Sequence, residues 1–293
     1  MSNRIIYQPK GAALEYAKWA CNLYNGCNHH CQYCYCKQGA WKNVLGVDAP
    51  VLKSQAGRNE EEAYLLFMRE LREHREQIIA DGDGLFFSFS TDPMLREEIA
   101  LTMRCVQECI IAGIPVTILT KATWWTRCGN ELAIDYFRQL VAWRDKITIG
   151  VTLTGHDELE PGAPTNKERI KLLDHLPHCG IRTFVSLEPV VDFESSLKMI
   201  LDSLHYTAEY RIGLMSPYKK DRYDHDQCER FCKKVTELSR QFGFTVKWKK
   251  SIQRFYEEGL PILNELKRIE REKKETNINK HKTKKQCEQQ NND

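Results

Sequence analysis

The sequence predicts an α/β protein: a partial (βα)6 barrel of the TIM type with parallel strands, followed by a C-terminal helical and disordered tail. Short runs rich in β-branched and aromatic residues alternate with longer segments of helical periodicity. About six such βα units fit into roughly 240 residues, which is short of the eight units of a complete barrel. An open flavodoxin-like sheet is the structural alternative.

The strands are expected at about 14–21, 84–90, 115–120, 146–154, 181–188, 210–216 and 244–249. The helices between them are expected at about 59–80, 95–112, 130–143, 165–178, 193–204 and 224–242. Asn59 precedes a Glu-rich first turn, and Gly180 and Gly243 follow their helices as capping residues. In both architectures, functional groups belong at the carboxyl ends of the strands.

Charge and composition divide the chain at about residue 258. We expect 1–258 to form the barrel and 259–293 to form a short helix, around 261–275, and a basic disordered tail. The last 28 residues carry nine Lys or Arg and five Asp or Glu, so the formal charge of +3 leaves about −1 for the rest. The tail is therefore the only charge-based candidate for nucleic-acid contact.

The chain has no run of about 18 apolar residues, and its polar start lacks the apolar stretch of a signal peptide. We therefore expect a cytoplasmic protein with no membrane contact. Its twelve cysteines then indicate metal or redox chemistry rather than disulfides. Five of them fall within sixteen residues: Cys21, Cys27, Cys31, Cys34 and Cys36.

Within the segment YNGCNHHCQYCYC, a CxxxCxxC array is formed by Cys27, Cys31 and Cys34. A structural zinc site usually has four ligands in two pairs, and no second pair lies nearby. An iron–sulfur cube held by three cysteines leaves one iron open for another ligand. The spacing favours iron–sulfur over zinc as the metal of this site.

This array, with Tyr33 just before its last cysteine and a predicted strand before it, resembles the signature of the radical S-adenosylmethionine (radical SAM) superfamily. The resemblance covers about residues 14–250. It implies a 4Fe-4S cluster on the three cysteines, whose open iron chelates S-adenosylmethionine. It also implies reductive cleavage of that cofactor to a 5′-deoxyadenosyl radical, which abstracts a hydrogen from a substrate. A reducing partner such as flavodoxin or ferredoxin is then required.

The resemblance also implies a cofactor bed at the strand ends. Family members carry a Gly-Gly-Glu-like turn after the second strand, and here Ser90, Thr91 and Asp92 take that place. The three residues have the composition of an ordinary helix N-cap as well. The other cofactor-binding candidates are Tyr33 beside the cysteines, Lys121 after the third strand, Thr152 and Thr154 at the fourth, and Glu188 at the fifth. Strand alternation puts Thr152 and Thr154 on one face. The Glu188 carboxylate could reach the adenosine or the substrate.

Within the superfamily, the turn STDP, the strand end TK and the segment EPGAPTNKERI most resemble the branch related to spore photoproduct lyase. That segment contains Glu160 and Arg169, whose roles do not follow from the resemblance. The lyase has a hydrogen-donating cysteine ahead of its turn, where this chain has Phe89 and Ser90. Cys128 is the best replacement thiol, and a small buried apolar residue is its alternative reading.

The sequence thus predicts a radical SAM enzyme of lyase or transferase type. Its preferred substrate is a nucleic-acid lesion or nucleotide. A peptide- or protein-modifying radical SAM enzyme is the alternative within the same chemistry. A non-enzymatic nucleic-acid-binding module, stabilised by zinc or by a cluster, is the alternative outside it. The oligomeric state does not follow from the sequence.

Overall fold

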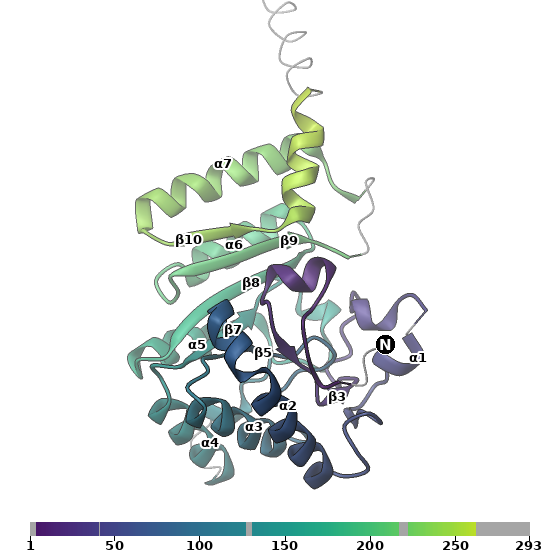
Figure 1. Ribbon diagram of the computed structural model, residues 1–293. Coiled ribbons are helices and arrows are strands. Elements are labelled where there is room, and N and C mark those ends of the chain that lie inside the picture. Colours follow the sequence, from purple (N-terminus) through teal and green to yellow (C-terminus); the bar gives the residue numbers. More distant parts are fainter. Residues whose placement is uncertain (1–3, 41, 127–130, 217–221, 262–293) are drawn as a thin grey trace, which may run out of the picture.

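The computed structural model describes residues 4–40, 42–126, 131–216 and 222–261. Eight strands of this part form one sheet in the order β1-β2-β5-β6-β7-β8-β9-β10 (Figure 1). Only β1 (Ile6–Tyr7) is antiparallel to its neighbour, and every other pairing in the sheet is parallel. The protein is therefore a mixed α/β structure with a mostly parallel sheet.

The parallel strands are β2 (Ala20–Cys21), β5 (Leu85–Phe87), β6 (Val116–Thr120), β7 (Ile147–Thr152), β8 (Arg182–Val190), β9 (Glu209–Leu214) and β10 (Thr245–Trp248). The helices that connect them are α2 (Glu60–Asp81), α3 (Ile99–Ile111), α4 (Glu131–Ala142), α5 (Asn166–His178), α6 (Phe193–Ser203) and α7 (His225–Phe242). A small antiparallel pair, β3 (Tyr24–Asn25) with β4 (Val51–Leu52), and the short helices η2 (Tyr35–Lys37) and α1 (Lys42–Leu45) flank the cysteine segment.

The predicted array of six βα units is confirmed, because one of the helices α2 to α7 precedes each parallel strand from β5 to β10. Within the described residues the strands lie in sequential order with no reversal. A flavodoxin-like sheet needs a point at which the strand order reverses, so that alternative is wrong here. The sheet ends, β1 and β10, are not paired with each other among the described strands, so strand pairing does not establish a closed barrel.

Capping residues set the ends of the long helices, and the predicted caps Asn59 and Gly243 are among them. The Asn59 side chain accepts a hydrogen bond of 2.9 Å from the backbone N–H of Glu62, and a capping box of Thr165 with Glu168 begins α5. Gly82 and Gly243 end α2 and α7 in the left-handed conformation. These local signals explain why the helix boundaries agree with expectation to within a few residues.

The two faces of the sheet have different surroundings. On β5, Leu85 and Phe87 belong to the large hydrophobic core, which they share with residues of helices α2 to α7. Phe86 points the other way and joins Ala17 and Ala20 in a smaller cluster. Since strand side chains alternate between faces, the helices cover one face and leave the second face to the N-terminal segment and a cavity.

The segment η1 (Gly11–Glu15) and Tyr16 cross this second face, from β2 and β5 to β8 and β10 (Figure 1). The Tyr16 ring contacts Phe86 at 5.6 Å between centroids, and its hydroxyl lies 2.7 Å from the hydroxyl of Ser186 on β8. The Glu15 carboxylate accepts a bond of 2.8 Å from the backbone N–H of Lys250. The prediction of a strand over 14–21 was wrong except at its last two residues, because Tyr16 is held by these distant contacts.

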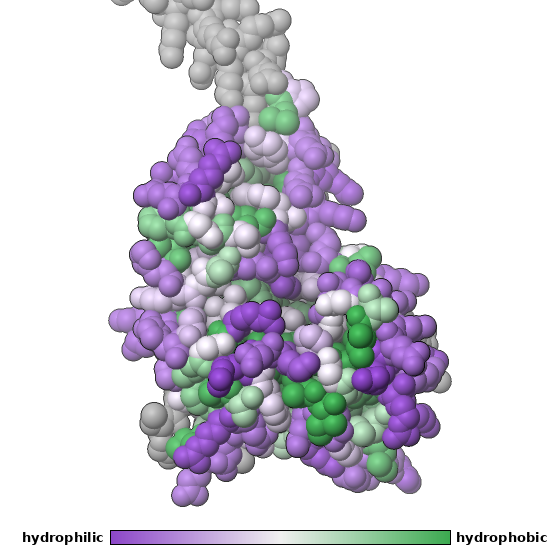
Figure 2. Space-filling view, turned by 60° about the vertical axis from the view of Figure 1, so that its left-hand side comes forward, coloured by the Kyte–Doolittle hydropathy of each residue, from purple (hydrophilic) through white to green (hydrophobic). Residues whose placement is uncertain are grey.

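A further helix, residues 250–261, follows β10 where the sequence suggested none before about 261. Ile252 and Phe255, one turn apart, are buried and fix its inner face. Most of the predicted helix 261–275 and the whole predicted tail lie outside the described residues. None of the described helices has the length and hydropathy needed to cross a membrane. On the face drawn in Figure 2, hydrophilic residues surround several separate apolar patches.

Candidate functional site

A cavity of about 420 Å³ lies where the carboxyl ends of β5 to β8 meet the cysteine segment. The strand ends contribute the predicted residues Ser90, Thr91, Asp92, Lys121, Thr152 and Glu188, together with Ser88, Phe89, Leu119, Thr120 and Pro189. The other wall comes from the N-terminal third of the chain: Lys10, Ala12, Ala13, Tyr16, Cys27, His29, His30, Cys31, Tyr33, Cys34, Tyr35, Cys36, Lys37 and 45–47. Almost all of the predicted site residues therefore line one cavity.

Backbone contacts hold the cysteine loop over the strand ends. The N–H of Gly26 donates to the Ser90 carbonyl at 3.1 Å, and the N–H of Cys27 donates to the Val47 carbonyl at 3.1 Å. Gly26 has a φ of 85°, and a Cβ there would lie 2.3 Å from the carbonyl oxygen of Ala49. A glycine before the first cysteine is therefore required for this close approach.

The three cysteines of the array have different electrostatic surroundings. A hydrogen bond from the Cys36 thiol, with smaller contributions from backbone N–H groups and Lys121, lowers the pKa of Cys34 to about 6. Burial raises the pKa of Cys27 to about 12, with the Asp92 charge acting in the same direction. Metal binding needs thiolates, and these surroundings favour the thiolate of Cys34 over that of Cys27.

The donor set fits an iron–sulfur cube. Cys27, Cys31 and Cys34 line one cavity, and a cube binds each thiolate at a different iron, so the sulfurs need not meet at a point. Among the described side chains, no three His, Cys, Asp or Glu groups converge as a single-ion site requires. Hydroxyls, three lysines and two carboxylates also line the cavity, and groups of both charges suit a zwitterionic cofactor.

Asp92 is the buried anchor of the loop. One of its oxygens accepts from the Thr120 hydroxyl at 2.7 Å and from the N–H of Met94 at 3.0 Å. The other accepts from the N–H of Lys121 at 2.7 Å and lies 2.8 Å from Nε2 of His29. Despite burial, these donors lower its pKa to about 2. Asp92 therefore ties the cysteine loop, through His29, to the ends of β5 and β6.

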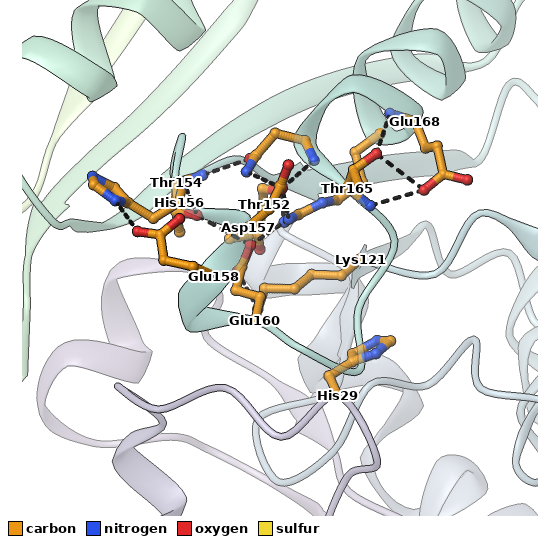
Figure 3. A network of polar contacts seen from close by, with 12 residues as sticks. His29, Lys121, Thr152, Thr154, His156, Asp157, Glu158, Glu160, Thr165 and Glu168 are labelled. Carbon is orange, nitrogen blue, oxygen red and sulfur yellow. Dashed lines mark hydrogen bonds and ion pairs between the residues drawn. The ribbon is translucent and has the colours of Figure 1, made fainter.

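Glu160 is the centre of a second buried network, drawn in Figure 3. Its carboxylate pairs with the guanidinium of Arg169, accepts from the hydroxyl of Tyr33, and accepts from the hydroxyl of Thr154 at 3.1 Å. Arg169 also donates to the carbonyl of Thr152 at 2.7 Å. Although burial opposes ionisation, the charges of Lys121 and Arg169 lower the pKa of Glu160. The network joins the cysteine loop to the end of β7.

Lys121 lies between this network and the cavity. Its ammonium is 3.8 Å from an oxygen of Glu160 (Figure 3). It also lies 5.6 Å from the centroid of the Tyr33 ring. Burial disfavours its charge, but Tyr33, Cys31 and Glu160 outweigh burial and raise the pKa of Lys121. A cation fixed at the cavity wall can bind a carboxylate or phosphate of a ligand.

The other predicted residues divide between the wall and the layer behind it. Thr152 lines the cavity, whereas Thr154 is fully buried against Glu160, because β7 ends at Thr152 and the strand alternation does not continue. The hydroxyl of Ser90 donates to the carbonyl of Tyr24, and the hydroxyl of Thr91 donates to Glu98. Cys128 lies outside the described residues.

Sequence reasoning did not identify four residues that shape the site. His29 and Cys36 sit in the loop with no pattern beyond the cysteine motif, and the Cys36 sulfur lies 3.6 Å from the carbonyl oxygen of Phe89. Tyr16 reaches the cavity from across the sheet, so no local signal marks it. Lys249 follows β10, and its only signal is a lysine just past the end of a strand.

Residues 21–206 of the chain match the radical SAM superfamily, a region that includes the cysteine array and the strands from β2 to β8. The chain belongs to the radical SAM superfamily. An uncharacterized protein of Acidianus two-tailed virus, ORF301, is 22% identical over 261 residues, which cover 78% of this chain and 82% of that protein. Uncharacterized proteins of Mycobacterium tuberculosis and Mycobacterium bovis are each 25% identical over 190 residues, covering 62% of this chain. The match spans about half, 52%, of the mycobacterial proteins.

Membership in the radical SAM superfamily indicates an enzyme that uses a 4Fe-4S cluster and S-adenosylmethionine. The three cysteines and the ends of β5 to β8 line one cavity. The superfamily match confirms the general prediction from the CxxxCxxC motif.

Proposed function

We propose that the protein binds a 4Fe-4S cluster on Cys27, Cys31 and Cys34 and cleaves S-adenosylmethionine reductively to start a radical reaction on a nucleic-acid lesion or nucleotide. The observation that carries this proposal is the single cavity shared by the three cysteines and the ends of β5 to β8. When bound, the cluster supplies one electron and the cofactor supplies a hydrogen-abstracting radical. The likeness to spore photoproduct lyase remains a proposal about the branch.

The chain's own residues have the following proposed roles. Lys121 binds the carboxylate of the cofactor, since it lines the cavity at the strand ends, whereas Lys37 beside the cysteines is paired with Asp48 at 2.5 Å. The hydroxyl of Thr152 and the polar turn at Ser90 and Thr91 are proposed to contact the cofactor from the strand ends. Asp92 and Glu160 act as positioning residues, because their oxygens already bind the loop residues His29 and Tyr33 or the strand ends.

The nucleic-acid substrate is supported by aromatic side chains in the cavity. Tyr16, Tyr33, Tyr35 and Phe89 line it, and stacking on such rings is a common way to bind an unpaired base. A peptide substrate is the alternative within the same radical chemistry. A flavodoxin or ferredoxin is proposed as the electron donor. The substrate decides whether the reaction is that of a lyase or of a transferase.

Anaerobic reconstitution with iron and sulfide, then addition of dithionite and S-adenosylmethionine, tests the proposal. We expect about four irons per chain and 5′-deoxyadenosine above the level without protein. The Cys31→Ala variant should lose both, whereas Cys179→Ala, a partly buried cysteine at the end of α5, should retain both. Cofactor cleavage by Cys31→Ala at the wild-type rate would contradict the ligand assignment. Ultraviolet-damaged DNA and an unmodified peptide are then compared as substrates.

A further inference from the structure

A third polar cluster joins β8, at the cavity wall, to the residue that follows β10. Glu188 on β8 lines the cavity, and 23% of its side chain is exposed. The ammonium of Lys249 is 3.8 Å from Oε2 of Glu188 and 3.4 Å from the centroid of the Tyr16 ring. At 3.8 Å the pair is an ion pair without a hydrogen bond. Neither residue belongs to the networks around Asp92 or Glu160.

Both charged atoms of this pair are buried without hydrogen-bond partners among the described residues. Oε2 of Glu188 and Nζ of Lys249 have almost no accessible surface, and the Lys249 side chain is only 3% exposed. Burial raises the pKa of Glu188 and lowers that of Lys249 to about 8. Burying a charged lysine costs folding free energy unless an opposite charge lies close to it. Here it faces a carboxylate that is itself partly open to the cavity.

The charged and titratable groups around Glu188 come from three elements. Lys249 follows β10, Glu15 and Tyr16 belong to the segment across the second face, and Arg211 lies on β9. The guanidinium of Arg211 is already bonded to Glu209 at 2.7 Å and stacks on Phe184 at 3.8 Å. Lys249 is therefore the cation available to keep Glu188 ionised and oriented.

The surroundings of Glu188 are aromatic. Phe89 stacks on Phe86 at 4.5 Å between centroids, and Tyr16 meets Phe89 edge-on at 6.1 Å. Phe89 and Tyr16 both line the cavity with Glu188. A carboxylate accepts hydrogen bonds and cannot donate them when ionised, so it selects a ligand group that carries N–H or O–H. A flat ring with N–H on its edge satisfies both the carboxylate and the aromatic wall.

We propose that Glu188 binds the N–H edge of a nucleobase in this cavity, with Phe89 and Tyr16 as its stacking surface and Lys249 as the residue that positions Glu188. This inference rests on the proposed function, because the base is that of the nucleic-acid substrate and not the adenine of S-adenosylmethionine. The two sources share one chemistry, namely a ring edge that donates a hydrogen bond. They differ in which base is bound, so matched nucleosides separate them.

Calorimetric titration of the reconstituted full-length protein at pH 7 tests this inference with two pairs of probes. Adenosine is compared with purine riboside, which lacks the amino group, and thymidine is compared with N3-methylthymidine, which lacks the ring N–H. We expect thymidine to bind roughly tenfold tighter than N3-methylthymidine. A preference within the adenosine pair alone would assign the subsite to the cofactor and overturn the inference.

Variants of Lys249 test its positioning role. In Lys249→Met the preference should fall below about twofold at pH 7 and return as the pH rises, because Glu188 without its cation ionises only at higher pH. Lys249→Arg should keep the preference at pH 7. Lys250→Met, an exposed lysine one residue along, is the matched control and should behave as the wild type. A purely structural role for Lys249 would give no recovery with pH.

If the affinities within each probe pair differ by less than twofold in the wild-type protein, the proposal is overturned, and no variant is needed for this result. A preference that Lys249→Met retains at pH 7 would overturn the role of Lys249. Iron content and 5′-deoxyadenosine formation are measured on the same preparation. A protein that binds iron and cleaves the cofactor but shows no probe preference refutes this inference and leaves the proposed function standing.

Discussion

Replacing Arg169 with methionine removes the cation of the most deeply buried ion pair at the site. Arg169 and Glu160 are both fully buried, and their pairing is accompanied by a bond of 2.7 Å from Arg169 to the Thr152 carbonyl. Breaking a buried pair by removing one partner costs about 3–5 kcal/mol, because a charge stays buried without compensation. Glu160 would keep only Tyr33, Thr154 and Lys121 as neighbours. We expect Arg169→Met to lose about that much unfolding free energy.

Urea unfolding followed by circular dichroism measures this loss. Arg138→Met on α4 is the matched control: this arginine is 76% exposed, lies 3.7 Å from Asp135, and should cost at most about 1 kcal/mol. The double variant Arg169→Met with Glu160→Gln should be less destabilised than the sum of its single variants, because the uncompensated charge is gone. A loss for Arg169→Met no larger than that of Arg138→Met would refute the reasoning.

Three further variants test separate parts of the fold. Burial raises the pKa of Glu98 to about 9, above its unfolded value of about 4.3. The contribution of Glu98 to the unfolding free energy is therefore full below the unfolded pKa and is lost as the pH rises toward 9. Glu98→Gln should raise the urea midpoint more at pH 8 than at pH 5, and equal changes would contradict this. Gly84 and Gly82 both have left-handed φ, but only at Gly84 would a Cβ meet backbone, 2.1 Å from the carbonyl oxygen of Pro115; Gly84→Ala should therefore lower the melting temperature clearly more than Gly82→Ala, and similar shifts would argue against the close approach. Thr165→Ala removes the capping box of α5 and should cost about 1 kcal/mol by urea unfolding; a change near zero would mean that water replaces the cap.

Local signals predicted most of the fold. The helices end near the predicted residues because their caps, such as Asn59 and Gly243, act within a few residues of the chain. The helix over 250–261 was missed because Gly259 and Pro261 are ordinary helix-ending signals, whereas burial of Ile252 and Phe255 decides the segment. Contacts far apart in the sequence override weak local preference in such places.

The sequence predicted the cysteines and the strand-end residues that line the cavity. It did not predict the contacts that hold these residues in place. Parallel strands that end at one edge bring Asp92, Lys121 and Thr152 together whatever lies between them. Nothing in the sequence indicates that Glu160 pairs with Arg169, or that Tyr16 reaches β8, since these contacts depend on how loops cross the sheet. The residues that make these contacts can be picked out in the sequence, but the partner of each residue cannot.

The segment that crosses the second face also sets an order of events during synthesis. Its contacts join Tyr16 to Ser186 and Glu15 to Lys250, residues separated by 170 and 235 positions. At about 5–20 residues per second, the partner of Glu15 leaves the ribosome on the order of ten seconds or more after the cysteine loop. Until then the segment can contact only strands made earlier. We expect the part of the cavity wall that Ala12, Ala13 and Tyr16 form to become fixed only after β10 has been made.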